Sequence, residues 1–302
     1  MTIGSSFERR VAGIRDVDRV RAARKHRKGD GAVLVTGASS GIGEATVSAL
    51  IGCGFRVWAT VRRDVDEQRL TATHGDRVTV RRCDITDPDQ VAALGTEVVA
   101  SGLVGLVSNA GIAVPAPLEY LPLEHFRHQL EVNLVGQLAV VQAVLPALRR
   151  TRGRVVVVGS IGDRIATPML GAYSASKFGL LGLTDSLRAE LAPSGVRVVL
   201  IEPGVISTRI WSSGRLRGEE LLAAAPPEAA RLYQSQIDRI RADADRAERR
   251  GLPPSTVAGV IATAMTSGNP RPRYLVGRDA QVAALVARLP DRLRYLLTAA
   301  KE

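Results

Sequence analysis

The stretch Val33-Leu-Val-Thr-Gly-Ala-Ser-Ser-Gly-Ile-Gly43 decides the fold, because it joins a short apolar run to a glycine-rich turn that opens a helix-length segment. Glycine lets a chain turn sharply and approach a phosphate closely, and the first turn of a helix offers unpaired N–H groups to an anion. A second apolar run follows at residues 56–60, which completes the order of strand, turn, helix and strand that a dinucleotide-binding unit requires. The residues predicted to lie against a pyrophosphate are Gly37, Ser39, Ser40, Gly41, Ile42 and Gly43.

The same alternation of short apolar runs and helix-length segments continues along the chain. Strands joined by helices in right-handed crossovers form a parallel sheet. We therefore predict an α/β fold with one domain over residues 31–280, a doubly wound (Rossmann) seven-stranded parallel sheet with the strand order 3-2-1-4-5-6-7. The further strands are expected at residues 78–82, 103–108, 154–158, 196–201 and 274–276.

Two segments flank this domain, a basic N-terminal arm and an amphipathic C-terminal segment. Residues 1–30 hold nine Lys and Arg against four Asp and Glu, and so contribute +5 to a net charge of +11. We interpret the arm as a solvated segment, with a partner or a peripheral membrane contact as the alternative; no zinc-finger spacing or aromatic-basic interleaving indicates nucleic acid. In residues 281–302 the apolar residues follow helical spacing, which favours a helix docked on the domain over a membrane anchor.

The remaining composition fits a soluble protein of a reducing compartment. A chain of 302 residues, 45% of them hydrophobic, can bury one large core. Cys53 and Cys83 fit core thiols better than a disulfide framework or a metal site of paired cysteines. No apolar run reaches the roughly 18 residues of a membrane-spanning helix, and the N-terminus lacks a signal-peptide core. We therefore expect a cytoplasmic protein without a transmembrane segment.

Polar and small residues follow the carboxyl ends of two further expected strands, where an open α/β sheet binds its ligand. Asp84, next to Ile85, either accepts a hydrogen bond from an adenine or satisfies the backbone N–H groups of its own loop. Asn109, Ala110 and Gly111 form a turn of small residues that is suited to line a cofactor crevice.

A phenol and an ammonium lie four residues apart in Tyr173-Ser-Ala-Ser-Lys177, on one face of an expected helix. A tyrosine titrates near ~10, so it acts as a base at neutral pH only if a positive charge stabilises its phenolate. Ser160 follows the fifth expected strand, but Val158-Gly-Ser-Ile-Gly162 misplaces the first glycine of a hydrolase nucleophile elbow. Asn133 lies inside the long helix expected over residues 122–150, where a buried amide requires a polar role.

Taken together, these motifs and Pro203-Gly204 resemble the short-chain dehydrogenase/reductase family over residues 31–277. Within the family, the branch of retinol and hydroxysteroid dehydrogenases is resembled by three stretches, Asp84-Ile-Thr-Asp-Pro88, Gly102-Leu-Val-Gly-Leu-Val107 and Arg273-Tyr-Leu-Val-Gly277. Ser108 is a departure, because the family usually has a second Asn there. The resemblance implies that Tyr173 is the general acid or base on the substrate oxygen and that Ser160 holds this oxygen. It also implies that Lys177 lowers the tyrosine pKa and binds the nicotinamide ribose, and that Asn133 anchors a water in a proton relay. The residues it places beside the nicotinamide are Pro203, Gly204, Val205 and Thr208.

The function implied is an NAD(P)-dependent oxidoreductase, needing no metal, that interconverts a secondary or retinoid-type alcohol and its carbonyl, as a homo-oligomer. Residues 209–252 match the family's mobile lid. Their apolar side chains favour a small apolar alcohol or ketone of steroid or retinoid type, although they also suit a helical pair packed on the core; they are Trp211, Leu221, Leu222 and Tyr233. The alternative is a catalytically silent dinucleotide-binding sensor or scaffold, whose mark would be a damaged Ser, Tyr or Lys; all three are present.

The end of the second expected strand favours NADP(H), with NAD(H) as the second choice. An NAD site usually places a carboxylate there for the adenosine ribose, whereas this chain has Thr60 and Val61. Arg62 comes next, and a guanidinium binds a 2′-phosphate well. Asp64 and Asp66 would favour NAD(H) if the following loop folded back.

Overall fold

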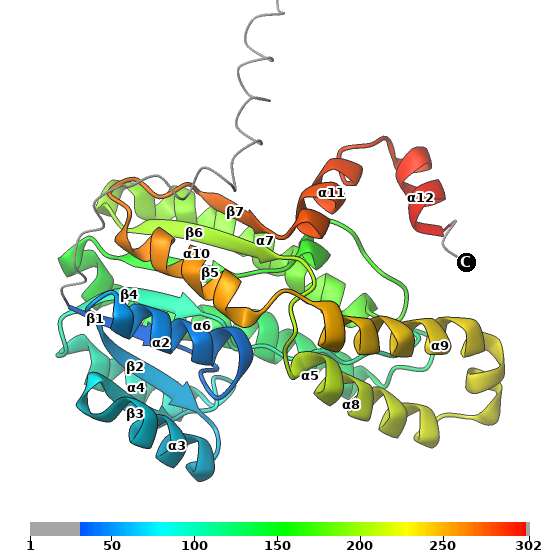
Figure 1. Cartoon of the computed structure of the whole chain (residues 1–302), viewed down its shortest axis with the longest axis horizontal. Coiled ribbons are helices and arrows are strands. Elements are labelled where there is room, and N and C mark those ends of the chain that lie inside the picture. Colours follow the sequence, from blue (N-terminus) through cyan, green and yellow to red (C-terminus); the bar gives the residue numbers. More distant parts are fainter. Residues whose placement is uncertain (1–30, 300–302) are drawn as a thin grey trace, which may run out of the picture.

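Seven parallel strands form one sheet in the predicted order 3-2-1-4-5-6-7 (Figure 1). The structure is a computed structural model that describes residues 31–299, so the basic arm of residues 1–30 lies outside the described residues. The predicted doubly wound α/β fold is confirmed. The strands are β1 (Ala32–Val35), β2 (Arg56–Val61), β3 (Val78–Arg82), β4 (Leu103–Ser108), β5 (Arg154–Val158), β6 (Arg197–Pro203) and β7 (Arg273–Val276).

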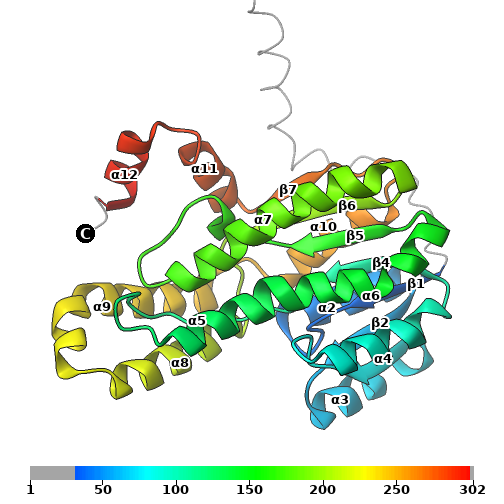
Figure 2. The same ribbon diagram turned by 180° about the vertical axis from the view of Figure 1, so that it is seen from behind.

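Helices cover both faces of the sheet, which explains why the strands read as continuous apolar runs. In β1, Val33 and Val35 face one core and Ala32 and Leu34 face the other. The first face carries α2 (Gly41–Gly52), α3 (Asp64–His74) and α10 (Pro254–Thr266). The second, in front in Figure 2, carries α4 (Pro88–Val99), α6 (Gly136–Thr151) and α7 (Gly171–Leu191).

The long helix expected over residues 122–150 is present but changes its winding in the middle. It consists of α5 (Leu123–Leu130), a π-helical segment at Glu131–Val135, and α6. By length and composition, Leu123–Thr151 could cross a membrane. Its buried residues instead pack on β4 and α4, and core helices of soluble proteins pass the same test. Short 3₁₀ turns complete the fold at Gly75–Arg77, Ile161–Asp163 and Ala192–Ser194.

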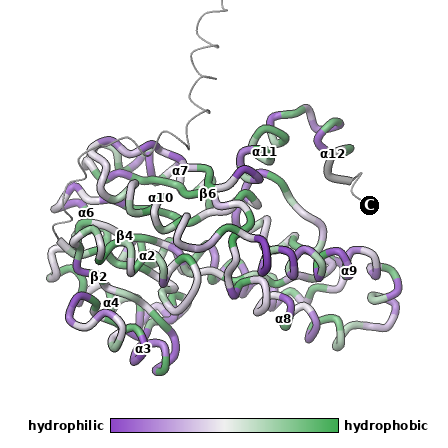
Figure 3. Tube along the Cα trace, viewed as in Figure 1, coloured by the Kyte–Doolittle hydropathy of each residue, from purple (hydrophilic) through white to green (hydrophobic). Residues whose placement is uncertain are grey.

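Two helix pairs lie outside the sheet layers. The first pair, α8 (Ile210–Ala224) and α9 (Pro227–Arg250), occupies the segment expected to form the lid and stands at the carboxyl ends of the strands (Figure 1). Hydrophilic residues are frequent along α9, in contrast to the sheet strands (Figure 3).

The second pair, α11 (Arg278–Val286) and α12 (Asp291–Ala299), forms where a docked amphipathic helix was expected, and α11 docks on the domain only in part. Helical spacing is observed, but α11 buries only the small residues Ala280 and Ala284. Four larger apolar side chains of that segment point to solvent. These side chains, each exposed by half or more, are Val282 (62%), Leu285 (64%), Leu293 (51%) and Leu296 (64%).

Two helix glycines, one tightly packed and one in open space, should respond oppositely to substitution by alanine. A Cβ at Gly95 would lie 2.9 Å from the Ala143 Cβ, so Gly95→Ala should destabilise the fold by about 1 kcal/mol through overpacking. A Cβ at Gly182 in α7 would meet nothing within 4 Å, so Gly182→Ala should stabilise the fold by roughly 0.5–1 kcal/mol. Urea denaturation of both variants measures the difference. If Gly95→Ala also stabilised the protein, α4 and α6 would have to lie farther apart.

Candidate active site

The ends of β1 and β4 are joined by hydrogen bonds at the point where the strand order reverses. Thr36 is fully buried, and its Oγ1 accepts from the Asn109 N–H (2.9 Å) and the Ala110 N–H (3.1 Å). The Asn109 side chain donates back to the carbonyls of Thr36 (3.0 Å) and Gly37 (3.2 Å). Behind this joint, Gln137 of α6 accepts from Ser108 Oγ and donates to the Ala110 carbonyl, both at 2.9 Å. The crevice above the joint is where an open α/β sheet binds its ligand.

The glycine-rich turn fits the phosphates of a dinucleotide. Gly37 and Gly41 have φ angles of 64° and 59°, which side chains rarely adopt. A Cβ at Gly37 would lie 2.8 Å from the Ala110 Cα, and one at Gly43 would lie 2.7 Å from Asn109 Nδ2. Ser40, the N-cap of α2, makes no side-chain capping bond, which leaves the first-turn N–H groups of the helix to an anion.

Around the end of β2, the acidic side chains turn away from the crevice and a basic one remains at it. Asp66 is buried and accepts from Arg63 Nε at 2.7 Å, and Asp64 forms an ion pair with Arg82. Arg62 is exposed and lines the cavity next to Val61. The condition under which NAD(H) would be favoured, a loop that folds its carboxylates back, is therefore not met in this structure.

Ser160, Tyr173 and Lys177 meet where β5 ends and α7 begins. Ser160 Oγ accepts from the Gly162 N–H (3.1 Å), and Ser160 and Tyr173 line the same cavity. Burial raises the pKa of Tyr173, the polar side chain of Ser160 acts in the opposite direction, and the charge of Asp163 raises it further. Lys177 Nζ lies 5.7 Å from the centre of the Tyr173 ring and donates to the Val158 carbonyl at 3.0 Å. Burial lowers the pKa of Lys177 to about 8, although the charge of Asp163 opposes this shift.

Asn133 lies in the π-helical segment, fully buried, and does not line the cavity. Its Oδ1 accepts from the Ile112 N–H (2.8 Å), and its Nδ2 donates to the Ile112 carbonyl and to Ser176 Oγ, both at 3.0 Å. The amide therefore clamps the loop after β4 to α7, one residue before Lys177. This supplies the polar role that an inward-facing asparagine requires, while the relay through a bound water stays a prediction.

The candidate residues converge on a cavity of about 650 Å³ that also reaches under the lid. Gly41, Gly43 and Asn133 lie behind its wall. Asp84 lines the cavity, and its Oδ1 accepts from the N–H and the hydroxyl of Thr86. The expected role of Asp84 in satisfying its own loop is therefore observed, while a contact with adenine stays a prediction. The remaining candidates at the wall are Gly37, Ser39, Ser40, Ile42, Arg62, Ile85, Asn109, Ala110, Gly111, Ser160, Tyr173, Lys177, Pro203, Gly204, Val205 and Thr208.

The lid helices α8 and α9 supply part of the cavity lining, and some of these residues were expected from the sequence. Trp211, Leu221 and Leu222 line the cavity as expected, whereas Tyr233 packs edge-on against Tyr120 and donates to Glu119 at 2.8 Å. Arg217 of α8 was missed. It lines the same cavity as Arg62, and its pKa is lowered by burial and by the positive charge of Arg62. No motif signals this residue, because only the fold brings α8 close to the end of β2.

Known proteins share both sequence and fold with this chain. The family model for short chain dehydrogenases matches residues 31–217. This chain belongs to the short-chain dehydrogenase family. Over 254 residues the protein is 37% identical to 3-amino-tetrahydro-pyrrolizinone reductase of Xenorhabdus hominickii, which covers 82% of this chain and 87% of that one. Over 262 residues it is 35% identical to retinol dehydrogenase 16 of Homo sapiens, with coverages of 84% and 82%.

A solved structure agrees with these relatives. A short chain dehydrogenase from Burkholderia cenocepacia in complex with NADP matches with a TM-score of 0.70 and 28% identity, over 90% of this chain and 98% of that one. This short-chain dehydrogenase is therefore an oxidoreductase that acts on CH–OH groups with a nicotinamide dinucleotide. The predicted family, and the likeness to retinol dehydrogenases within it, are confirmed.

The clamp at Asn133 predicts a loss of stability. Asn133→Ala leaves the N–H of Ile112 without its partner, although the Ile112 carbonyl keeps its bond from Gln129. The variant should therefore lose about 1–3 kcal/mol of unfolding free energy even without cofactor. Chemical denaturation of the cofactor-free protein measures this cost. Asn269→Ala, at an exposed asparagine, is the control and should change stability by less than about 0.5 kcal/mol. Equal stabilities of the two variants would contradict the clamp.

Proposed function

We propose that this short-chain dehydrogenase interconverts an apolar secondary or retinoid-type alcohol and its carbonyl, with Tyr173 as the general acid or base. The observation that carries the proposal is the meeting of Ser160, Tyr173 and Lys177 on a cavity that continues to the glycine-rich turn. The nicotinamide ring, when bound, donates or accepts the hydride. The chain itself has to position the substrate oxygen and move one proton.

Each of the three side chains has a separate task in this proposal. The hydroxyl of Ser160 already accepts a bond from the Gly162 N–H, so its own proton can be donated toward the substrate oxygen. The phenol of Tyr173 gives its proton to the forming alkoxide in reduction and takes it back in oxidation. The ammonium of Lys177 favours the phenolate form of Tyr173.

The walls of the cavity support an apolar substrate of substantial size. Aromatic and aliphatic side chains come both from the loops after the strands and from the lid. The volume of about 650 Å³ lies in the range of pockets that enclose small organic ligands. The name of the relative retinol dehydrogenase 16 agrees with an apolar alcohol. The wall residues of this kind include Pro115, Tyr120, Met169, Leu170, Trp211, Leu221 and Leu222.

A preference for NADP(H) is supported by two guanidinium groups at the same end of the cavity. Burial first, and then the positive charge of Arg62, lower the pKa of Arg217, so the two guanidinium groups repel one another. A 2′-phosphate bound between them would remove the repulsion and bond to both. The carboxylates of Asp64 and Asp66, which would repel such a phosphate, are bound to arginines outside the cavity wall.

The silent sensor or scaffold is not favoured, because the reactive side chains are intact and meet at the cavity. A screen of secondary alcohols and ketones with NADP(H) and NAD(H) tests the enzyme directly, since a sensor binds cofactor without turnover. The cytoplasmic location, the homo-oligomeric state and a peripheral membrane contact stay predictions from the sequence.

The first kinetic prediction concerns the phenol. Tyr173→Phe removes the transferred proton but little of the cavity wall, so turnover in both directions should fall about 100-fold to 10,000-fold. Cofactor binding, followed by fluorescence titration, should stay close to that of the wild type. Tyr274→Phe, on β7 and outside the cavity, is the matched control and should retain turnover. A Tyr173→Phe enzyme that kept more than about a hundredth of the wild-type rate would refute the acid-base role.

The second kinetic prediction concerns cofactor choice. Arg62→Ala and Arg217→Ala should each raise KM for NADP(H) about tenfold or more, with little change for NAD(H), because each removes a charge-assisted bond to the 2′-phosphate. Calorimetric titration with adenosine 2′,5′-bisphosphate gives the same comparison without turnover. Arg231→Ala, at an exposed arginine of α9, is the control. A wild-type enzyme with the higher kcat/KM for NAD(H) would overturn the assignment.

A further inference from the structure

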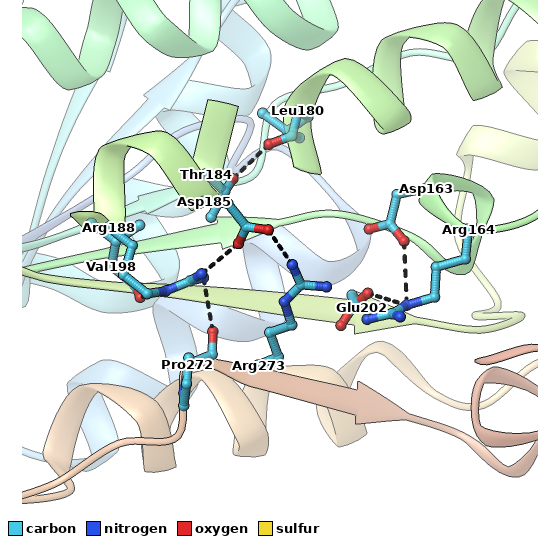
Figure 4. A network of polar contacts seen from close by, with 10 residues as sticks. All are labelled: Asp163, Arg164, Leu180, Thr184, Asp185, Arg188, Val198, Glu202, Pro272 and Arg273. Carbon is cyan, nitrogen blue, oxygen red and sulfur yellow. Dashed lines mark hydrogen bonds and ion pairs between the residues drawn. The ribbon is translucent and has the colours of Figure 1, made fainter. Parts of the chain in front are cut away.

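A pair of carboxyl groups is buried beside the candidate catalytic residues, and the proposed mechanism does not use it. Asp163, at the end of the 3₁₀ turn Ile161–Asp163, is 1% exposed, and Glu202 of β6 is 0% exposed. Both lie against Arg164, whose Nε is 2.6 Å from Glu202 Oε1 and 3.8 Å from Asp163 Oδ1 (Figure 4). One guanidinium therefore serves two buried carboxyl groups.

The oxygen atoms of this acid pair indicate a shared proton. As two carboxylates they leave both Asp163 oxygens and Glu202 Oε2 buried without a hydrogen bond, which is costly. If one carboxyl carries a proton, Asp163 and Glu202 can hydrogen-bond to each other, as in other paired carboxyl groups. Burial first, and then the charge of Glu202, raise the pKa of Asp163 to about 7. The acid pair therefore gains or loses its proton close to neutral pH.

Asp163 is built into the turn that carries Ser160. Its N–H donates to the Ser160 carbonyl at 3.0 Å, and a Cβ at Gly159 would lie 2.9 Å from its Oδ2. The turn packs on α7, the helix of Tyr173 and Lys177, and the charge of Asp163 raises the pKa of both side chains.

Other charged groups near the turn are engaged elsewhere. On α11, which also contacts the turn, Asp279 accepts from the Val205 N–H and Arg278 is exposed. Farther along α7, Asp185 pairs with Arg188 and Arg273 (Figure 4). Asp163 is thus the buried anion that acts on both Tyr173 and Lys177.

We propose that Asp163, coupled to Glu202 through a shared proton, is a positioning residue whose charge keeps Lys177 protonated and so sets the upper pH limit of catalysis. This inference rests on the proposed roles of Tyr173 and Lys177. A nearby negative charge favours the ammonium form of a lysine, whereas burial disfavours it. As pH rises, the acid pair loses its proton at about 7, before Lys177 does so at about 8. The negative charge is therefore complete at the pH where the lysine requires it.

The test is the pH dependence of kcat/KM for the reduced cofactor, which reports ionisations of the free enzyme. In the wild type we expect an alkaline limb near pH 8, from loss of the Lys177 proton. Asp163→Asn should move this limb to lower pH by on the order of half to one unit, because the supporting charge is gone. Glu202→Gln disturbs the same buried cluster but leaves Asp163 able to ionise, so its limb should stay at the wild-type pH. Asp185→Asn, on α7 like Lys177 but farther from the site, is the control, and it should leave the alkaline limb at the wild-type pH.

A second measurement does not require turnover. An acid whose pKa is raised in the folded state contributes stability that is complete below its unfolded pKa and is lost as pH rises through the folded value. Wild-type stability should therefore fall between about pH 4 and pH 7 because of Asp163. The Tm of Asp163→Asn relative to the wild type should increase over that range. If Asp163→Asn does not fold, Glu202→Gln should show a weaker fall, since it removes the charge that raises the pKa of Asp163.

Two results would overturn the inference. One is an active wild type whose alkaline limb is unmoved in Asp163→Asn, or is moved equally by Asp163→Asn and Glu202→Gln, which would indicate a structural role alone. The other is a Tm difference that does not change with pH. A wild type that binds cofactor but turns over no alcohol or ketone would instead refute the proposed function, and the stability measurement would still test the shared proton.

Discussion

The joint between β1 and β4 is the constraint on which the site depends. The hydroxyl of Thr36 and the amide of Asn109 bind the two strand ends together at the point where the chain reverses its direction across the sheet. Neighbouring crossovers diverge at this point, and the crevice between them exists only because the strand ends are held side by side. Gly37 and Gly43 can approach Asn109 and Ala110 so closely because they lack side chains.

Buried polar groups hold the rest of the site, and they differ in how well they are satisfied. Gln129, Asn133 and Gln137, on one side of the long helix, bond to backbone groups of the loop after β4. A satisfied buried network rigidifies its surroundings, because each bond is stronger in a medium of low dielectric. Asp163 and Glu202 are the contrasting case, since their oxygens find too few donors. Buried polar groups without hydrogen bonds require an explanation, and the proposed explanation is a proton that the two carboxyl groups share.

The lid pair is held less firmly than the sheet layers. In α8 only Gly214 is buried, and in α9 the buried residues are Ala229, Ile237, Ala244 and Ala247. Segments with few buried apolar contacts open at low free energy, which would suit the admission of the proposed apolar substrate. Hydrophilic residues are frequent along α9 (Figure 3), and several of them, such as Gln234 and Asp238, are exposed. Arg217 of α8 lines the same cavity as Arg62.

The sequence by itself determined the strands from their apolar runs, and the preference for right-handed crossovers determined their order. A Tyr-to-Lys spacing of four residues is a weak signal alone, so Ser160, Tyr173 and Lys177 became candidates through the combination of motifs that resembles the family. The tertiary structure decided what depends on meetings between distant segments. Asp163 and Glu202 lie on different elements, and Arg217 lines the same cavity as Arg62 only because the fold brings α8 to the carboxyl ends of the strands. The C-terminal segment shows the same limit: its spacing predicted helices correctly, but α11 docks through small residues while Val282 and Leu285 stay exposed. Helical spacing fixes which side chains share a face, whereas burial of that face requires a complementary surface elsewhere in the fold.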